Sequence, residues 1–148
     1  MAFVSNSPSF RSTDEVQLEN GGAGVEALVL SGIDGDTPVY VLPSESGFVA
    51  TALAASTYGV VGVPEYGSIA SGAVGTIRIK GYREGVQGSA AAFACGIGHA
   101  IAWSAGTLYA TSTAYTGYEH QVAICTEAGL SGSTTANMVL TGIVGNPI

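Results

Sequence analysis

The segment "TIRIKGYREGVQG", residues 76–88, contains three of the four basic residues of the chain: Arg78, Lys80 and Arg83. Isoleucines alternate with the first two of these cations. Successive side chains of an extended strand point to opposite faces. The alternation therefore predicts a strand with one buried apolar face and one charged face. The main question that the sequence raises is what the charged face contacts.

The surrounding sequence has the texture of a β protein. Strand-like runs such as 25–32 and 39–42 end at turns rich in Gly, Asp or Pro, and such turns recur about every ten residues, as in sandwiches and barrels. The 22 glycines suit turns and bulges better than helices. We therefore predict a mainly β protein with a single compact β-sandwich or β-barrel domain. At most one or two short helices are expected, within 47–57 and 89–104.

Residues 1–24 differ from the rest of the chain. They are rich in Ser and Asn, show no sustained period, carry Phe3 and Phe10, and close on the flexible sequence "NGGAG". We predict an extended N-terminal arm, ordered only against another surface, followed by a β-rich domain over residues 25–148. The alternative is a frayed tail, although such tails seldom keep large apolar side chains.

The charge balance restricts the possible partners. The formal net charge is −7, whereas a nucleic-acid-binding protein needs a basic surface, so we expect no nucleic acid partner. Charged residues make up only 10% of the chain, against a typical quarter, and a surface so poor in charge is unfavourable for a free monomer. This predicts a homo-oligomer, the alternative being a monomer covered with Ser, Thr and Gly.

No segment has the length and hydropathy of a transmembrane helix, and we expect no membrane partner. The most apolar run, 90–103, is too short and contains glycines and His99. The N-terminus lacks the basic start and apolar core of a secretory signal, so we expect the protein to stay in the compartment where it is made. Cys95 and Cys125 should then be reduced core residues, with a disulfide as the alternative.

The cysteines and histidines offer one candidate metal site. Cys95, His99, His120 and Cys125 follow the order C-x3-H and H-x4-C, and zinc takes about four such ligands. This spacing is not a standard zinc pattern, and His120 and Cys125 would point to opposite faces of a regular strand. We therefore expect no metal and no cofactor.

Catalytic motifs are weak. A Ser-His-Asp set stays open because its members need not be adjacent in sequence, but no Ser occupies a G-x-S-x-G elbow. Asp34 and Asp36 resemble half of a calcium loop, yet the remaining ligands of that loop are missing and a plain turn is favoured. We expect no catalytic residues and no enzyme.

The segment "LYATSTAYTGY" contains Tyr109, Tyr115 and Tyr118. On a strand, Tyr109 and Tyr115 would share a face, and Tyr combines a large apolar area with a polar tip. This cluster supports a second hypothesis, a carbohydrate- or surface-binding β module of a virion fibre or adhesin. Ordinary packing of strand residues is the alternative.

Two stretches, 58–88 and 100–115, resemble the small decoration or cement proteins of tailed bacteriophage capsids. In that group, a pattern of Gly, Val and small residues leads to a turn and an Ala-Gly segment that ends in Leu. The matching residues here are Gly59, Val60, Val61, Ser71, Gly72, Ile77, Ile79, Gly81 and Val86, then Ala105, Gly106, Thr107 and Leu108. The resemblance covers the central part of the chain.

This resemblance implies a β-rich viral structural protein, a homo-trimer without an active site. It would be made in the host cytoplasm and then bind the major capsid protein on the outer surface of the virion, where it bridges and stabilises capsid subunits. Contacts to the capsid protein or a neighbouring copy would come from six residues: Phe3, Phe10, Arg11, Arg78, Lys80 and Arg83. The alternative is that the cations of residues 76–88 pair with the chain's own carboxylates, such as Glu65 or Glu84.

Overall fold

The computed structural model describes residues 15–18, 22–53, 59–88, 93–104, 107–110, 121–142 and 144–145. Every regular element in these ranges is a β-strand, which confirms the predicted mainly β fold, and no helix there could cross a membrane. The strands are β1 (Glu15–Gln17), β2 (Ala23–Val29), β3 (Val39–Ser44), β4 (Gly47–Ala52), β5 (Gly59–Pro64), β6 (Val74–Gln87), β7 (Ala100–Ser104), β8 (Thr107–Ala110), β9 (Gln121–Cys125), β10 (Thr135–Thr141) and β11 (Val144–Gly145).

Five strands close into a β-barrel in the order β2-β4-β3-β5-β6 and back to β2. The β2–β4 pair is parallel and the other four pairs are antiparallel. Alternate residues of each strand point into the barrel, and the side chains that fill it are small and aliphatic. The interior cluster consists of Val25, Ala27, Val29, Ile33, Val39, Val41, Ala50 and Ile77.

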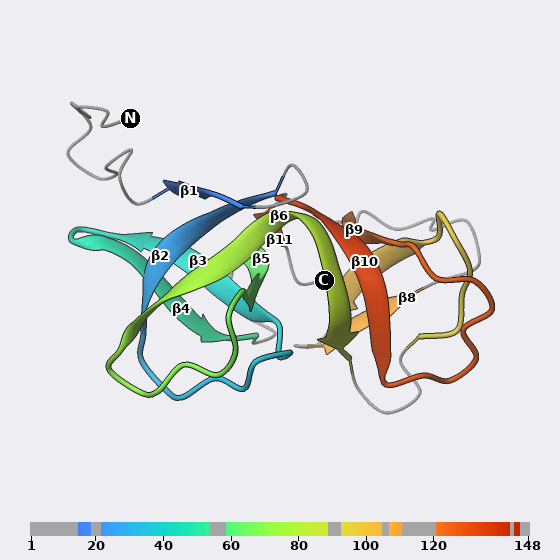
Figure 1. Ribbon diagram of the computed structural model, residues 1–148, viewed down its shortest axis with the longest axis horizontal. Helices are drawn as coiled ribbons and strands as arrows, with labels where there is room; N and C mark the ends of the chain where they lie inside the picture. Colours follow the sequence, from blue (N-terminus) through green and yellow to red (C-terminus); the bar gives the residue numbers. More distant parts are fainter. Residues whose placement is uncertain are drawn as a thin grey trace.

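A second sheet continues from the far half of β6 in the order β6-β10-β9-β7-β8. The 14-residue strand β6 belongs to both halves of the molecule, and Figure 1 shows it passing from the barrel over to β10. Ile77, in its first half, pairs with Val25 of the barrel, whereas Arg83, in its second half, pairs with Met138 of β10.

The second core lies between this sheet and the outer face of the barrel. Tyr40 alternates with the interior residues of β3, so its ring points outward, and Val61 and Val63 of β5 do the same. They join buried residues of the second sheet and its connections: Val86, Phe93, Cys95, Ile101, Leu108, Val122, Ala123, Cys125, Ala136, Met138 and Leu140.

Part of the segment predicted as an arm belongs to the barrel. β1 pairs with β2 antiparallel, with Gln17 opposite Ala23, and β2 itself begins before the predicted boundary at residue 25. Residues 1–14, with Phe3, Phe10 and Arg11, lie outside the described residues.

Candidate functional site

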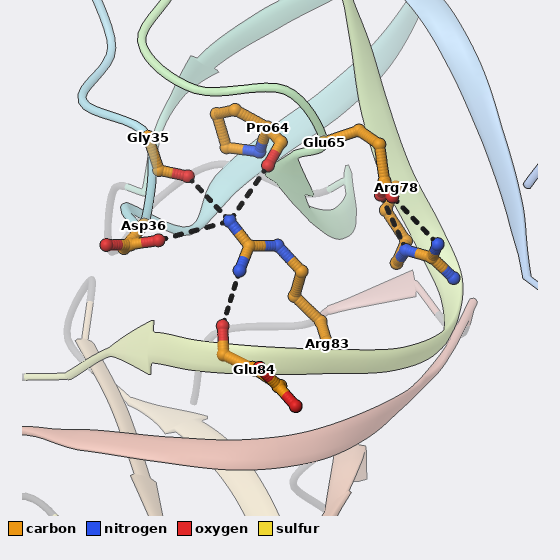
Figure 2. Close-up of polar contacts among 7 residues, drawn as sticks. All are labelled: Gly35, Asp36, Pro64, Glu65, Arg78, Arg83 and Glu84. Carbon is orange, nitrogen blue, oxygen red and sulfur yellow. Dashed lines mark hydrogen bonds and ion pairs between the residues drawn. The ribbon is translucent and has the colours of Figure 1, made fainter. Parts of the chain in front are cut away.

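Arg78 lies on the outer face of the barrel, opposite in direction to the buried Ile77, as the alternation predicts. This outer position is nevertheless buried, because Arg78 is only 3% exposed. Its guanidinium binds the Glu65 carboxylate through two hydrogen bonds, from Nε to Oε2 at 2.6 Å and from Nη2 to Oε1 at 2.8 Å (Figure 2). Two parallel charge-assisted bonds are the strongest geometry available to an arginine and a carboxylate.

Two glycines make room for this buried arginine. A Cβ atom on Gly22 would lie 1.8 Å from Nη1 of Arg78, and one on Gly81 would lie 3.0 Å from the same atom. Gly81 also has a φ of 99°, which disfavours any residue with a side chain. Arg78 thus joins the end of β5 to the segment before β2 at the point where β6 leaves the barrel.

Arg83 fixes the next part of β6. Its Nη2 donates to the carbonyl oxygens of Gly35 at 2.9 Å and Pro64 at 3.1 Å, and to Oδ1 of Asp36 at 3.1 Å. Its Nη1 donates to the carbonyl oxygen of Glu84, and Figure 2 shows the side chain spanning these groups. The side chain of Asp36 is 66% exposed, so this ion pair is in contact with solvent.

Lys80 lies between these two arginines and differs from both. It is exposed, pairs through its backbone with Ala23 and Thr141, and forms no ion pair within the described part of the chain. The chain's own carboxylates therefore hold Arg78 and Arg83, as the alternative interpretation predicted, while the charge of Lys80 faces solvent.

The buried thiols are core residues. Cys95 and Cys125 are free and buried, and Sγ of Cys125 donates to the carbonyl oxygen of Glu127 at 3.6 Å. Burial, followed by the neighbouring Cys125 thiol and then the charge of Glu127, raises the pKa of Cys95 to about 12. The sequence-based interpretation of both residues as small core side chains is confirmed.

Cys95, His99 and Cys125, the three candidate metal ligands that the structure describes, do not form a metal-binding cluster. Nδ1 of His99 accepts the backbone N–H of Gly96 at 2.9 Å, and His120 lies outside the described residues. Within the described ranges, no group of three or more His, Cys, Asp or Glu side chains is arranged to hold a metal ion. At the candidate calcium loop, Thr37 donates to the carbonyl of Asp34 at 3.1 Å and the Asp36 carboxylate binds Arg83, so the structure has a turn there.

The tyrosine cluster lies beyond what the structure describes. Residues 111–120, with Tyr115 and Tyr118, are outside the described residues. The backbone of Tyr109 pairs with Ala102 of β7 in the last strand of the sheet.

Sequence reasoning missed an exposed aliphatic surface on the barrel. Leu28 is 37% exposed, Leu30 57% and Val74 63%, and Leu28 lies directly opposite Val74 in the β2–β6 pair. A signal was present in "VEALVL", residues 25–30, because both alternating sets of positions there contain aliphatic residues. One set fills the barrel and the other covers its outside.

Comparison with known proteins gave no match: no family model, curated protein or solved structure is significantly similar to this chain.

Proposed function

We propose that this chain is a decoration or cement protein of a bacteriophage capsid. It binds the major capsid protein on the outside of the mature shell and stabilises the shell by bridging neighbouring subunits. The proposal is supported by the resemblance of residues 58–88 and 100–115 to that group and by the closed β-rich fold. The observation that carries it furthest is the exposure of Leu28, Leu30 and Val74 on one side of the barrel.

Exposed aliphatic side chains favour association. Apolar side chains scattered singly on a surface are normal, whereas adjoining ones such as Leu28 and Val74 favour a contact surface. Full burial of one Leu or Val side chain contributes about 1.5–3 kcal/mol. A capsid presents many equivalent sites, and a protein that binds the assembled lattice but not its free subunits stabilises the lattice at each of them.

The remaining proposed contacts are the arm and Lys80. Gln17 of β1, Ala23 of β2 and Lys80 of β6 form one line across three neighbouring strands. The segment that carries Phe3, Phe10 and Arg11 precedes β1, whose first residue, Glu15, lies level with Val25 of β2 and Ile77 of β6, three residues before Lys80. In this proposal both contact the capsid protein, whereas Arg78 and Arg83 hold the fold and act on the contact only indirectly.

The test is co-sedimentation with capsids purified from a phage that lacks the gene for this chain. We expect the full chain to saturate the capsids and to raise their melting temperature. A chain that lacks residues 1–14 should bind more weakly while keeping β1. Failure of the correctly folded full chain to sediment with the capsids would refute the proposal.

A charge-matched pair of variants tests the lysine. Lys80→Gln and Gln87→Glu each lower the net charge by one, and both sites are exposed on β6. We expect Lys80→Gln to weaken binding by about two- to fivefold, the range of an exposed ion pair, and Gln87→Glu to leave binding unchanged. Equal effects of the two would remove Lys80 from the contact.

A further inference from the structure

Outward-pointing aliphatic residues form one row across four strands of the barrel, and Leu28 and Val74 are the exposed members of the row. In the strand registers, Val74 of β6 lies opposite Leu28 of β2, Leu28 beside Val49 of β4, and Val49 opposite Leu42 of β3. All four alternate with interior residues and therefore point outward. Leu30, two residues after Leu28 and just beyond the end of β2, lies beside this row. We call Leu28, Leu30, Val49 and Val74 the aliphatic face.

One end of this row is already covered. Leu42 packs against the second core, while exposure rises across β4 and β2 to 63% at Val74. The aliphatic face is thus continuous with the buried core between the two sheets, and it becomes a surface where the second sheet no longer covers the barrel.

Two carboxylates border the aliphatic face on the same side. Glu26 precedes Leu28 by two residues on the outer face of β2, and its Oε1 accepts a hydrogen bond from the hydroxyl of Thr76. Glu45 is exposed in the turn between β3 and β4, two residue pairs beyond Leu42 and Val49. Because β2 and β4 are parallel and Ala27 pairs with Phe48, Glu45 and Glu26 lie toward the same end of the barrel.

The cations of the barrel's outer face do not balance these carboxylates. Arg78, next after Thr76 on that face of β6, is buried against Glu65. Lys80 lies a further two residues along the strand, level with Ala23. The exposed surface around the row is therefore aliphatic at its centre, and its border toward the start of β2 carries two carboxylates against one lysine.

We infer that the aliphatic face docks on a protein surface that has an aliphatic patch bordered by Lys or Arg side chains. Charge complementarity selects this partner over a second copy of the chain, because each copy carries a net charge of −7 and would bring the same Glu26 and Glu45 carboxylates to the contact. The inference rests on the proposed function, under which the partner is the capsid protein. The sequence of residues 76–88 predicted that basic side chains of this chain contact the partner. In the present inference this chain instead supplies carboxylates, and the partner supplies the basic side chains.

The experiment uses the same capsids and two matched variants of the full chain. Leu28→Thr/Val74→Thr removes aliphatic area at exposed strand positions and keeps residues that favour strands. Ile124→Thr makes the same kind of change on β9, where the side chain is 42% exposed on the other sheet. We expect the double variant to lose about tenfold or more in affinity, which equals about 1.4 kcal/mol, and the control to bind normally.

A second set of binding measurements tests the carboxylates at the border of the aliphatic face. Glu45→Gln should weaken binding by about two- to fivefold and reduce its salt dependence, because exposed ion pairs are weak and are screened by salt. Equal or tighter binding of Glu45→Gln would exclude a basic partner at this border.

Three further results would overturn the inference. If the wild-type chain binds capsids and Leu28→Thr/Val74→Thr binds equally well, the aliphatic face is not the docking surface, while the proposed function stands. If the wild-type chain does not bind at all, the proposed function fails and the inference with it. If light scattering shows that the double variant, but not Ile124→Thr, breaks a wild-type oligomer, the face is a contact between copies.

Discussion

The two halves of the molecule, the barrel and the second sheet, bury their apolar side chains in different ways. The barrel closes on itself, and the fully buried cluster in its interior consists of Val, Ala and Ile, with Phe48, Ile69 and Ile79 packed against it. The second sheet is open, ends at β8 among the described strands, and buries its residues against the outside of the barrel. The fully buried positions of the narrow barrel hold small side chains, whereas the space between two layers accommodates Tyr40, Phe93, Met138 and two cysteines. The second half therefore depends on the first for its core.

The strand β6 connects these halves, and its two arginines differ as the halves do. Arg78 is buried in a two-bond ion pair at the barrel end, while Arg83 reaches the solvent-exposed Asp36 near the second sheet. The difference shows that the same residue type on one strand can be a buried anchor or a surface link.

The largest effect is expected for the buried anchor. Glu65→Gln leaves the charge of Arg78 buried without its carboxylate, which typically costs about 3–5 kcal/mol. We expect a loss of that size in the free energy of unfolding, measured by urea denaturation.

The control for this prediction replaces both partners. The double variant Arg78→Met/Glu65→Leu fills the site with apolar side chains of similar size, and its stability should be close to that of the wild type. A loss below about 1 kcal/mol for Glu65→Gln alone would show that the pair behaves like a surface salt bridge.

A smaller effect is expected at the bend of β6. Gly81→Ala combines a φ of 99° with a Cβ atom only 2.7 Å from Cα of Gly22, and we expect a loss of about 2–3 kcal/mol. Gly85→Ala, with a φ of 63° and open space around the added Cβ, should lose about 1 kcal/mol. Thermal and urea unfolding of both variants measure the difference, and equal losses would contradict the close approach of Gly22.

Alkaline pH should weaken the second core selectively. The Cys95 thiol stays protonated in the folded state up to a pKa of about 12, whereas the unfolded chain releases this proton above its ordinary value of 9.0. The stabilisation is therefore complete below pH 9 and falls by about 1.4 kcal/mol per unit as the pH rises toward 12. Burial also raises the pKa of Tyr40, which adds to the loss, while the buried cluster described inside the barrel is entirely aliphatic.

Urea denaturation across this pH range measures the slope. Cys95→Ala should be less stable at neutral pH and should show a shallower decline above pH 9. An unchanged slope in this variant would assign the alkaline loss to Tyr40 or to groups outside the second core.

The smallest effect is expected at the exposed link. Asp36→Asn should cost less than about 1 kcal/mol, because the carboxylate is mostly exposed and Arg83 keeps its three carbonyl partners. A loss comparable to that of Glu65→Gln would mean that the two arginines are equivalent and would remove the contrast between them.

The sequence contained enough information for the fold class and for the inward and outward sides of residues 76–80. It did not reveal that the outward side is buried at Arg78 and exposed at Lys80, because this depends on Glu65 and on Gly22, which is distant in sequence. β1 was missed because three residues show no period. The Ala-rich helix candidate became β7 at its end, since pairing with β8 and β9 outweighs local preference. The aliphatic face could not be predicted from the sequence, because its residues come from three separate strands and only the strand registers place them side by side.

The position of β6 in the chain also affects how the protein is made. All five barrel strands lie within residues 23–87, so the barrel can close while β7 to β10 are still untranslated. At that stage the outward side chains of Tyr40, Val61 and Val63 have no second sheet above them, because their partners in the core are synthesised later. A product terminated after residue 88 would thus be a closed barrel with Tyr40, Val61 and Val63 exposed on one side, and we expect it to aggregate more readily than the full chain.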